Sequence, residues 1–182
     1  PIYNLGLALK YQGRYNEAYD RFYKSCWNAA WQDAGYFACA QISTMQSRLE
    51  DALDEIDRSL IRNWHNHKAR ALKTAILRRM GRTEEALQLI EDSLSIDKFN
   101  FGCRYEKYLI TNVVDELSVM KEMMRGEPHN YDEIALDYCA AGCWQEAASL
   151  WNIAIAEGIV TPMTYYYLCL LYTSDAADDR IS

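Results

Sequence analysis

Two small groups of side chains in this sequence are of the types that bind metal ions. His65 and His67 are separated by one residue, and Cys139 and Cys143 would lie about one helical turn apart. A zinc site needs further nitrogen or sulfur ligands at a fixed spacing, and only His129 lies near the cysteine pair. We therefore interpret the histidines as part of a solvated loop and the cysteines as packing residues, and we expect no metal site.

Pairs of neighbouring acidic residues are a second candidate for chemistry, because two carboxylates can share general acid and base catalysis. Three of the acidic pairs in the sequence are Glu50 with Asp51, Asp54 with Glu55, and Glu84 with Glu85. Each pair falls at the start of an expected helix, where negative charge complements the helix dipole. No glycine-rich phosphate loop or nucleophile elbow is present in the sequence. The sequence therefore predicts no catalytic residue and no cofactor, and we expect a protein that is not an enzyme.

The helices that carry these residues are predicted by an internal repeat of 34 residues, marked by Ala18, Ala52 and Ala86. Each alanine ends a turn in which a small residue is followed by an arginine and later by an acid. A bulky apolar residue follows each alanine after four positions and a serine after seven, namely Phe22, Ile56 and Ile90, and Ser25, Ser59 and Ser93. A fixed period of this length is typical of a solenoid of antiparallel helix pairs. We expect the alanines to be buried where the two helices of a pair meet.

The period changes after the third unit. The next turn of the same kind, residues 142–147, places Ala147 61 residues after Ala86, and 61 is 34 plus 27. A shortened helix pair must therefore lie between, and we expect the array to bend or change pitch near residues 110–130. The predicted units are residues 1–32, 33–66, 67–99, 100–127, 128–160 and a partial unit at 161–168.

The repeat resembles the tetratricopeptide repeat (TPR) family. Leu5-Gly6 and Ala18-x3-Phe22 match the L-G and A-x3-F of its motif, whereas the closing proline is replaced by Ala30, Trp64 and Lys98 in the first three units. The resemblance implies an all-α fold, a right-handed α-solenoid of antiparallel pairs with about eleven helices. It also implies that the first helix of each pair lines a concave face that binds peptides or partner helices.

Carrying the register of the family over to this chain places nine candidate binding residues on the concave face. They are Tyr3, Leu7, Lys10, Tyr11, Phe37, Gln41, Met45, Arg78 and Arg79. This set is aromatic at one end and basic at the other, so it could receive an acidic or aromatic peptide, with the arginine donors free to grip a carboxylate. The alternatives are a solvated groove, or a groove filled by another domain of the parent chain.

Composition narrows the classes of partner. The chain has 182 residues, half of them hydrophobic, and a formal net charge of −7, which argues against a nucleic-acid partner. No apolar run is long enough to cross a membrane. The six cysteines have no framework spacing, which favours a reducing compartment such as the cytoplasm. We therefore predict a noncatalytic protein–protein interaction scaffold whose partner is a protein, a peptide or another domain of the same chain.

Both ends of the sequence carry further expectations. The chain begins at Pro1 without an initiator methionine, so we expect it to be part of a longer protein. The Tyr- and Trp-rich array also resembles the C-terminal portion of larger bacterial proteins with an N-terminal β-sandwich domain. This resemblance implies the alternative function, an accessory C-terminal module of a larger bacterial enzyme, with a carbohydrate-related activity, that packs on its own catalytic domain. Residues 169–179 resemble one reading frame of a transposase-based sequencing adaptor, so we expect residues 169–182 to be an artefactual tail.

Overall fold

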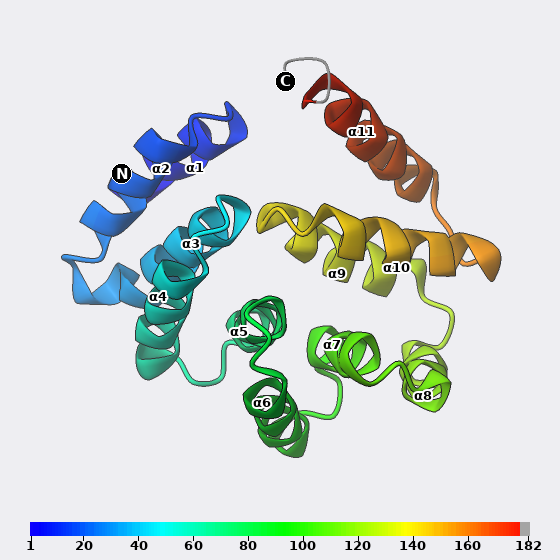
Figure 1. The fold of residues 1–182 in the computed structure, drawn as a ribbon. Helices are drawn as coiled ribbons and strands as arrows, with labels where there is room; N and C mark the ends of the chain where they lie inside the picture. Colours follow the sequence, from blue (N-terminus) through cyan, green and yellow to red (C-terminus); the bar gives the residue numbers. More distant parts are fainter. Residues whose placement is uncertain (179–182) are drawn as a thin grey trace.

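A computed structural model describes residues 1–178 of the chain, with side chains up to residue 173. These residues form eleven α-helices and a short 3-10 helix, and no strand (Figure 1). The helices are α1 (Ile2–Tyr11), α2 (Tyr15–Ser25), α3 (Gln32–Met45), α4 (Leu49–Arg62), α5 (His67–Arg79), α6 (Thr83–Ile96), α7 (Phe101–Thr111), α8 (Val114–Met124), α9 (Pro128–Ala140), α10 (Trp144–Ala156) and α11 (Pro162–Asp178), with η1 at Ala29–Trp31. The predicted all-α solenoid of antiparallel helix pairs is thereby confirmed. Helix α11 includes residues 169–178 of the expected artefactual tail, and the last four residues of the chain, 179–182, lie outside the described part.

The repeated turns share one backbone geometry. Gly13, Gly81 and Gly142 have left-handed φ values of +73°, +74° and +72°, and Ser47 adopts the same region with φ +59°. The amide of the next residue donates to a carbonyl five positions back, as in Arg14 to Leu9, Arg48 to Ser43, Arg82 to Leu77, and Cys143 to Tyr138. This bond closes the end of the first helix of each pair. The arginines of the turn pair with an exposed acid three positions on, so they mark local turn structure.

The repeated alanines lie where the two helices of a pair touch. Ala18, Ala52, Ala86 and Ala147 are all fully buried, as expected from the repeat. Space is equally limited on the first helix of a pair. In the first pair, a Cβ atom at Gly6 on α1 would lie 2.7 Å from the ring of Phe22 on α2. Small residues are therefore needed at both positions to let the helices approach.

Replacing Ala52 by Leu should overpack the contact between α3 and α4. We expect the free energy of unfolding to fall by about 1–3 kcal/mol, because a fully buried alanine leaves no room for three more carbon atoms. Urea unfolding followed by circular dichroism measures the change. The control is Ala8→Leu, at an exposed position of α1, and an equal loss for both variants would contradict the predicted register.

The array changes direction at the shortened fourth pair. Helices α7 and α8 have 11 residues each, against 13 or 14 in α3 to α6, although α1 and α2 of the first pair are as short with 10 and 11. The residues that cap the C-terminal ends of α7 and α8, Asn112 and Arg125, both adopt the left-handed conformation, with φ 54° and 56°. In Figure 1, α5 to α8 are seen nearly end-on, whereas α9 and α10 run across the view. The helix axes therefore change direction between the fourth and fifth pairs, and a departure from the pitch of residues 1–96 stays a prediction.

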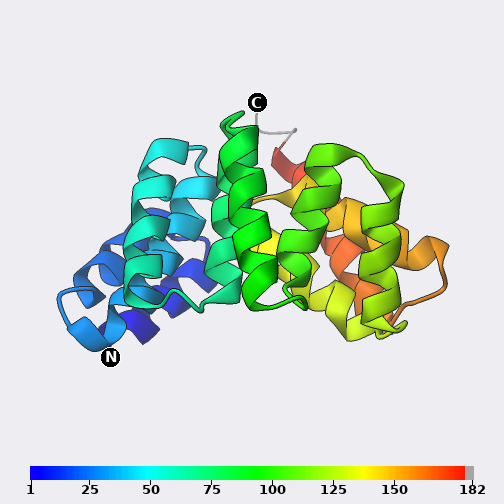
Figure 2. The ribbon, with the colours of Figure 1, turned by 90° about the horizontal axis from the view of Figure 1, so that it is seen from below.

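The bend brings the fifth pair back onto the inner side of the second and third pairs. The amino group of Lys68 on α5 lies 2.9 Å from a carboxylate oxygen of Asp137 on α9, and Arg78 on α5 lies 2.7 Å from Glu146 on α10. Figure 2 shows α9 behind the helices of the third and fourth pairs when the molecule is seen from below. One hydrophobic core runs from α3 to α11. The concave face is therefore partly covered by the chain itself.

Candidate partner-binding site

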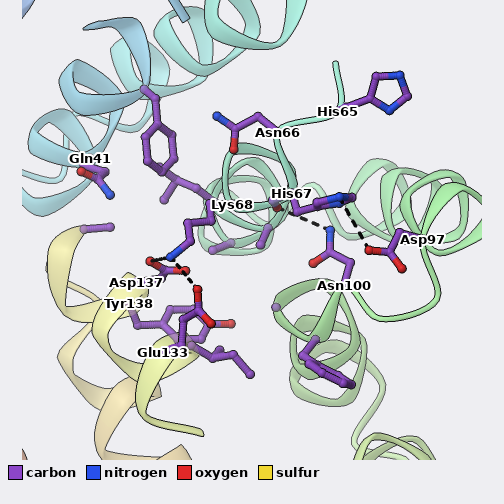
Figure 3. Close-up of a pocket in the computed structure, with 18 of the residues that line it drawn as sticks. Gln41, His65, Asn66, His67, Lys68, Asp97, Asn100, Glu133, Asp137 and Tyr138 are labelled. Carbon is purple, nitrogen blue, oxygen red and sulfur yellow. Dashed lines mark hydrogen bonds and ion pairs between the residues drawn. The ribbon is translucent and has the colours of Figure 1, made fainter. Parts of the chain in front are cut away.

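An open cavity of about 500 Å³ remains on the inner face, bordered by α3, α5, α7 and α9 (Figure 3). We call it the inner pocket. It is lined by Phe37, Gln41, Asn63, His65, Asn66, His67, Lys68, Ala71, Leu72, Ala75, Asp97, Phe99, Asn100, Phe101, Gly102, Glu133, Ile134, Asp137, Tyr138 and Ala141. Most of its wall is apolar, and the charged side chains lie on α5, on α9 and in the loop before α7.

Two asparagines fix the starts of α5 and α7 at this pocket. The side-chain oxygen of Asn66 accepts a hydrogen bond from the amide of Ala69 at 3.0 Å, and that of Asn100 accepts one from Cys103 at 3.2 Å. Each asparagine thus caps its helix by satisfying a free first-turn amide. The side-chain nitrogen of Asn100 also donates to the carbonyl of His67 at 3.4 Å, which ties the two helix starts together (Figure 3).

The two helices also approach each other closely beside the pocket. A Cβ atom at Gly102 would lie 2.7 Å from the Cβ atom of Ala71, so α7 can lie this close to α5 only with glycine there. The sequence of the fourth pair therefore helps to set the width of the inner pocket.

A lysine between two acids stands at the mouth of the pocket. The amino group of Lys68 lies 2.9 Å from Asp137 and 3.1 Å from Glu133 (Figure 3). Partial burial lowers the pKa of Lys68, but the hydrogen bonds and charges of both acids outweigh it and raise that pKa above its ordinary value. Burial raises the pKa of Asp137, against the opposing effect of Lys68. With Asp97 near His67, the acids at this pocket outnumber its lysine by three to one.

The structure separates the nine candidate binding residues. Phe37 and Gln41 line the inner pocket, where Lys10 donates to the side-chain oxygen of Gln41 at 2.7 Å. Burial lowers the pKa of Lys10 to about 8. Tyr3 and Leu7 pack against the core of the first pair.

Two further candidates lie away from the inner pocket. Tyr11 is 88% exposed on α1. Met45 is covered by Gly142, since a Cβ atom at Gly142 would lie 2.7–2.9 Å from its Cα, Cβ and Cγ atoms.

Arg78 is held inside the protein, so the prediction that its donors are free is wrong. Its guanidinium group donates to Glu106 at 2.7 and 3.2 Å and to Glu146 at 2.7 Å. Glu106 is fully buried and also accepts a hydrogen bond from Tyr138 at 2.7 Å. Burial raises the pKa of Glu106, while Arg78 and Tyr138 oppose the shift. The basic end expected for the groove is therefore an internal ion-pair network.

Arg79 is also engaged. One of its terminal nitrogens donates to the carbonyl of Thr44 at 3.4 Å and to the sulfur of Cys143 at 3.5 Å. Neither partner is an acid and the other nitrogens of the group have no hydrogen-bond partner among the described residues, so for Arg79 the prediction of donors not tied to acids is not contradicted. The partners of both arginines include residues beyond the break in the repeat, where no register carried over from the first three units could place them.

The histidine pair and the cysteine pair that were considered as metal ligands lie in different parts of the structure. His67 lies 3.6 Å from Asp97, and burial raises the pKa of Cys139 to about 12 and that of Cys143 to about 11. Within residues 1–178, no group of three or more histidine, cysteine or acidic side chains is arranged to hold a metal ion. None of the described helices is both long and apolar enough to cross a membrane.

The chain is similar to known proteins in structure rather than in sequence. No protein-family model and no curated protein sequence matches it. Solved structures do match. MamA superposes with a TM-score of 0.60 at 12% identity, covering 84% of this chain and 94% of MamA. TTC0263, a thermophilic TPR protein in Thermus thermophilus, has a TM-score of 0.57 at 14% identity, covering 94% and 97% of the two chains.

A tetratricopeptide repeat protein from Parabacteroides merdae ATCC 43184 has a TM-score of 0.59 at 17% identity, covering 98% of this chain and 73% of that one. The chain has the TPR fold. The resemblance drawn from the repeated residues is therefore confirmed at the level of fold. At these identities the similarity to other TPR structures defines the architecture, and the partner has to be argued from the inner pocket of this chain.

Proposed function

We propose that this TPR-fold protein is a noncatalytic scaffold that binds a segment of a partner protein in the inner pocket. The observation that carries this proposal is the pocket itself, an apolar cavity of about 500 Å³ on the inner face of the solenoid. That volume lies in the range of sites that bury a ligand of moderate size. In TPR solenoids the first helices of the pairs form the concave binding surface, and here α3, α5, α7 and α9 border the cavity.

The lining specifies the chemistry of the segment. Phe37, Phe101 and Tyr138 offer aromatic surface to a bulky apolar side chain, which would gain affinity by leaving water. The excess of carboxylates at the pocket favours a lysine or arginine next to that side chain. This differs from the acidic peptide expected from the sequence, because Arg78 is engaged by internal acids. Such a segment can belong to a separate protein or to another domain of the same polypeptide.

Selection from a random peptide library displayed on phage tests the proposal. We expect enrichment of segments that place a large apolar residue beside lysine or arginine. Glu133→Lys should lower the affinity of the protein for the most strongly enriched peptide by about tenfold. The substitution reverses a charge beside the bound cation at a partly screened surface. Isothermal titration calorimetry at low salt measures the change, because screening reduces it as salt rises.

The chain offers a closely matched control for this variant. Glu133 and Asp137 both pair with Lys68. Glu91 is placed in the same way, because it and Glu116 each lie 3.0 Å from the amino group of Lys107. Their side chains are 65% and 61% exposed. Glu91→Lys should therefore leave peptide binding unchanged. Enrichment of acidic peptides, or an equal effect of both variants, would contradict the proposal.

A further inference from the structure

A second cavity lies between α2, α3 and α4 and shares no residue with the inner pocket. Its volume is about 210 Å³, which suits one long side chain better than a free ligand of drug size. We call it the tyrosine pocket. It is lined by the rings of Tyr19, Tyr23 and Tyr36 and by the side chains of Asp51, Asp54, Glu55 and Arg58.

Glu55 is a buried acid that forms no ion pair with the described residues, although Arg48 is close enough to act on it electrostatically. It is only 4% exposed and accepts a hydrogen bond from the hydroxyl of Tyr19 on Oε1, while Oε2 has no hydrogen-bond partner among the described residues. Burial raises the pKa of Glu55, while the hydroxyls of Tyr19 and Ser43 and the charge of Arg48 oppose this shift. The other fully buried glutamate, Glu106, is paired with Arg78. Buried carboxylates normally have such a cation, because an unpaired charge is costly to desolvate.

The walls of the pocket are suited to a cation. The rings of Tyr19 and Tyr23 are stacked with centroids 6.1 Å apart, and Tyr36 meets Tyr23 edge-on at 6.2 Å and 83°. Aromatic faces attract lysine and arginine side chains. The chain itself already shows this preference at two of the rings. The guanidinium group of Arg48 lies 5.1 Å from the ring centre of Tyr19, and that of Arg58 lies 5.6 Å from the ring centre of Tyr36 and 2.8 Å from Asp54.

The geometry points to a second binding site: the tyrosine pocket accepts a lysine or arginine side chain of a partner protein. The incoming cation lies against the tyrosine rings and supplies the ion pair that Glu55 lacks. The half-exposed side chain of Arg58 moves aside to admit this cation. This site is formed by α2, α3 and α4 alone, so it does not depend on binding at the inner pocket.

Two small probes that differ only in charge test the site. N-acetyl-arginine methylamide carries the cation, and N-acetyl-citrulline methylamide has nearly the same shape without charge. Each is titrated into protein with isotope-labelled tyrosine rings, and the shifts are followed by NMR. We expect saturable shifts of Tyr19, Tyr23 and Tyr36, with binding of the arginine probe about tenfold tighter than that of citrulline.

Three variants assign the effect to the pocket. Glu55→Gln keeps the size of the side chain and should remove the preference for the cationic probe. Arg58→Ala, at an exposed position that should not affect folding, should tighten binding of that probe by a few fold because the ring of Tyr36 becomes free. Glu133→Lys, in the inner pocket, should change nothing here. Equal binding of both probes, unchanged binding in Arg58→Ala, or shifts spread over tyrosines outside the pocket would overturn the assignment.

Discussion

Replacing Arg78 by Ala should lower the free energy of unfolding by about 3–5 kcal/mol, because it leaves a buried carboxylate without its cation. Glu106 is fully buried, and Arg78 is its only cationic partner within the described residues. The same substitution also removes the contact to Glu146, which joins α5 to α10. Urea unfolding of the wild type and the variant at neutral pH measures the loss.

The control is another arginine of the repeat in a different setting. Arg82 pairs with Glu85 three positions on, and both side chains are exposed. Arg82→Ala should therefore have a much smaller effect than Arg78→Ala, since solvent can replace the exposed pair. Similar losses for the two variants would show that the Arg78 network contributes no more than a surface ion pair.

The loss in Arg78→Ala should also depend on pH. Burial raises the pKa of Glu106 in the folded protein above its ordinary value, and the hydrogen bonds of Arg78 oppose this shift. Without Arg78 the folded-state pKa should rise further, so the folded variant binds a proton that the unfolded chain releases at lower pH. Protonation of Glu106 thus stabilises the folded variant at low pH. This stabilisation is lost as the pH rises from the pKa of Glu106 in the unfolded chain to its higher pKa in the folded variant. The difference in the free energy of unfolding between the variant and the wild type should therefore shrink as the pH is lowered from neutral toward the ordinary pKa of a glutamate side chain.

Replacing Gly142 by Ala should produce the second large effect, and Gly81→Ala is its matched control. Both glycines have nearly the same left-handed φ, +72° and +74°. A Cβ atom at Gly81 would meet no atom within 4 Å, whereas one at Gly142 would lie 2.7–2.9 Å from Met45. Gly81→Ala should therefore cost only the backbone strain, about 1–2 kcal/mol. Gly142→Ala should cost about 1–3 kcal/mol more, through overpacking against α3.

Urea unfolding of the two variants under the same conditions separates these contributions. Since the backbone strain is common to both, the difference between them measures the contact of the turn before α10 with α3. Equal losses of unfolding free energy in the two variants would mean that the turn at Gly142 does not pack closely against Met45 in solution. A larger loss in Gly81→Ala would contradict the packing at both turns.

Much of the fold could be predicted from the sequence, because in the first three units each signal is local and repeated. The buried alanines and the left-handed turns recur every 34 residues, and neighbouring pairs pack in a way that such a period determines. The return of α9 and α10 onto α3 and α5 could not be predicted. A break in the period indicates that the direction changes, but it does not indicate toward which face.

The same limit applies to the candidate site. Phe37 and Gln41 line the inner pocket as their place in the second unit suggested. The role predicted for Arg78 was wrong, because its partners Glu106 and Glu146 come from pairs outside the strict repeat. Glu133 and Asp137, at the mouth of the pocket, belong to that returning pair and carried no periodic signal.

The contacts between α5 and the fifth pair bear on how cooperatively the chain folds. In a solenoid whose units touch only their neighbours, stability is close to a sum of local terms, and the units can unfold one after another from either end. Here the contacts of Lys68 with Asp137 and of Arg78 with Glu146 join residues 69 and 68 positions apart. They make the third and fifth units direct neighbours and close a loop around the fourth. Unfolding of the fifth pair therefore breaks contacts with the third pair as well as with its neighbours in the chain.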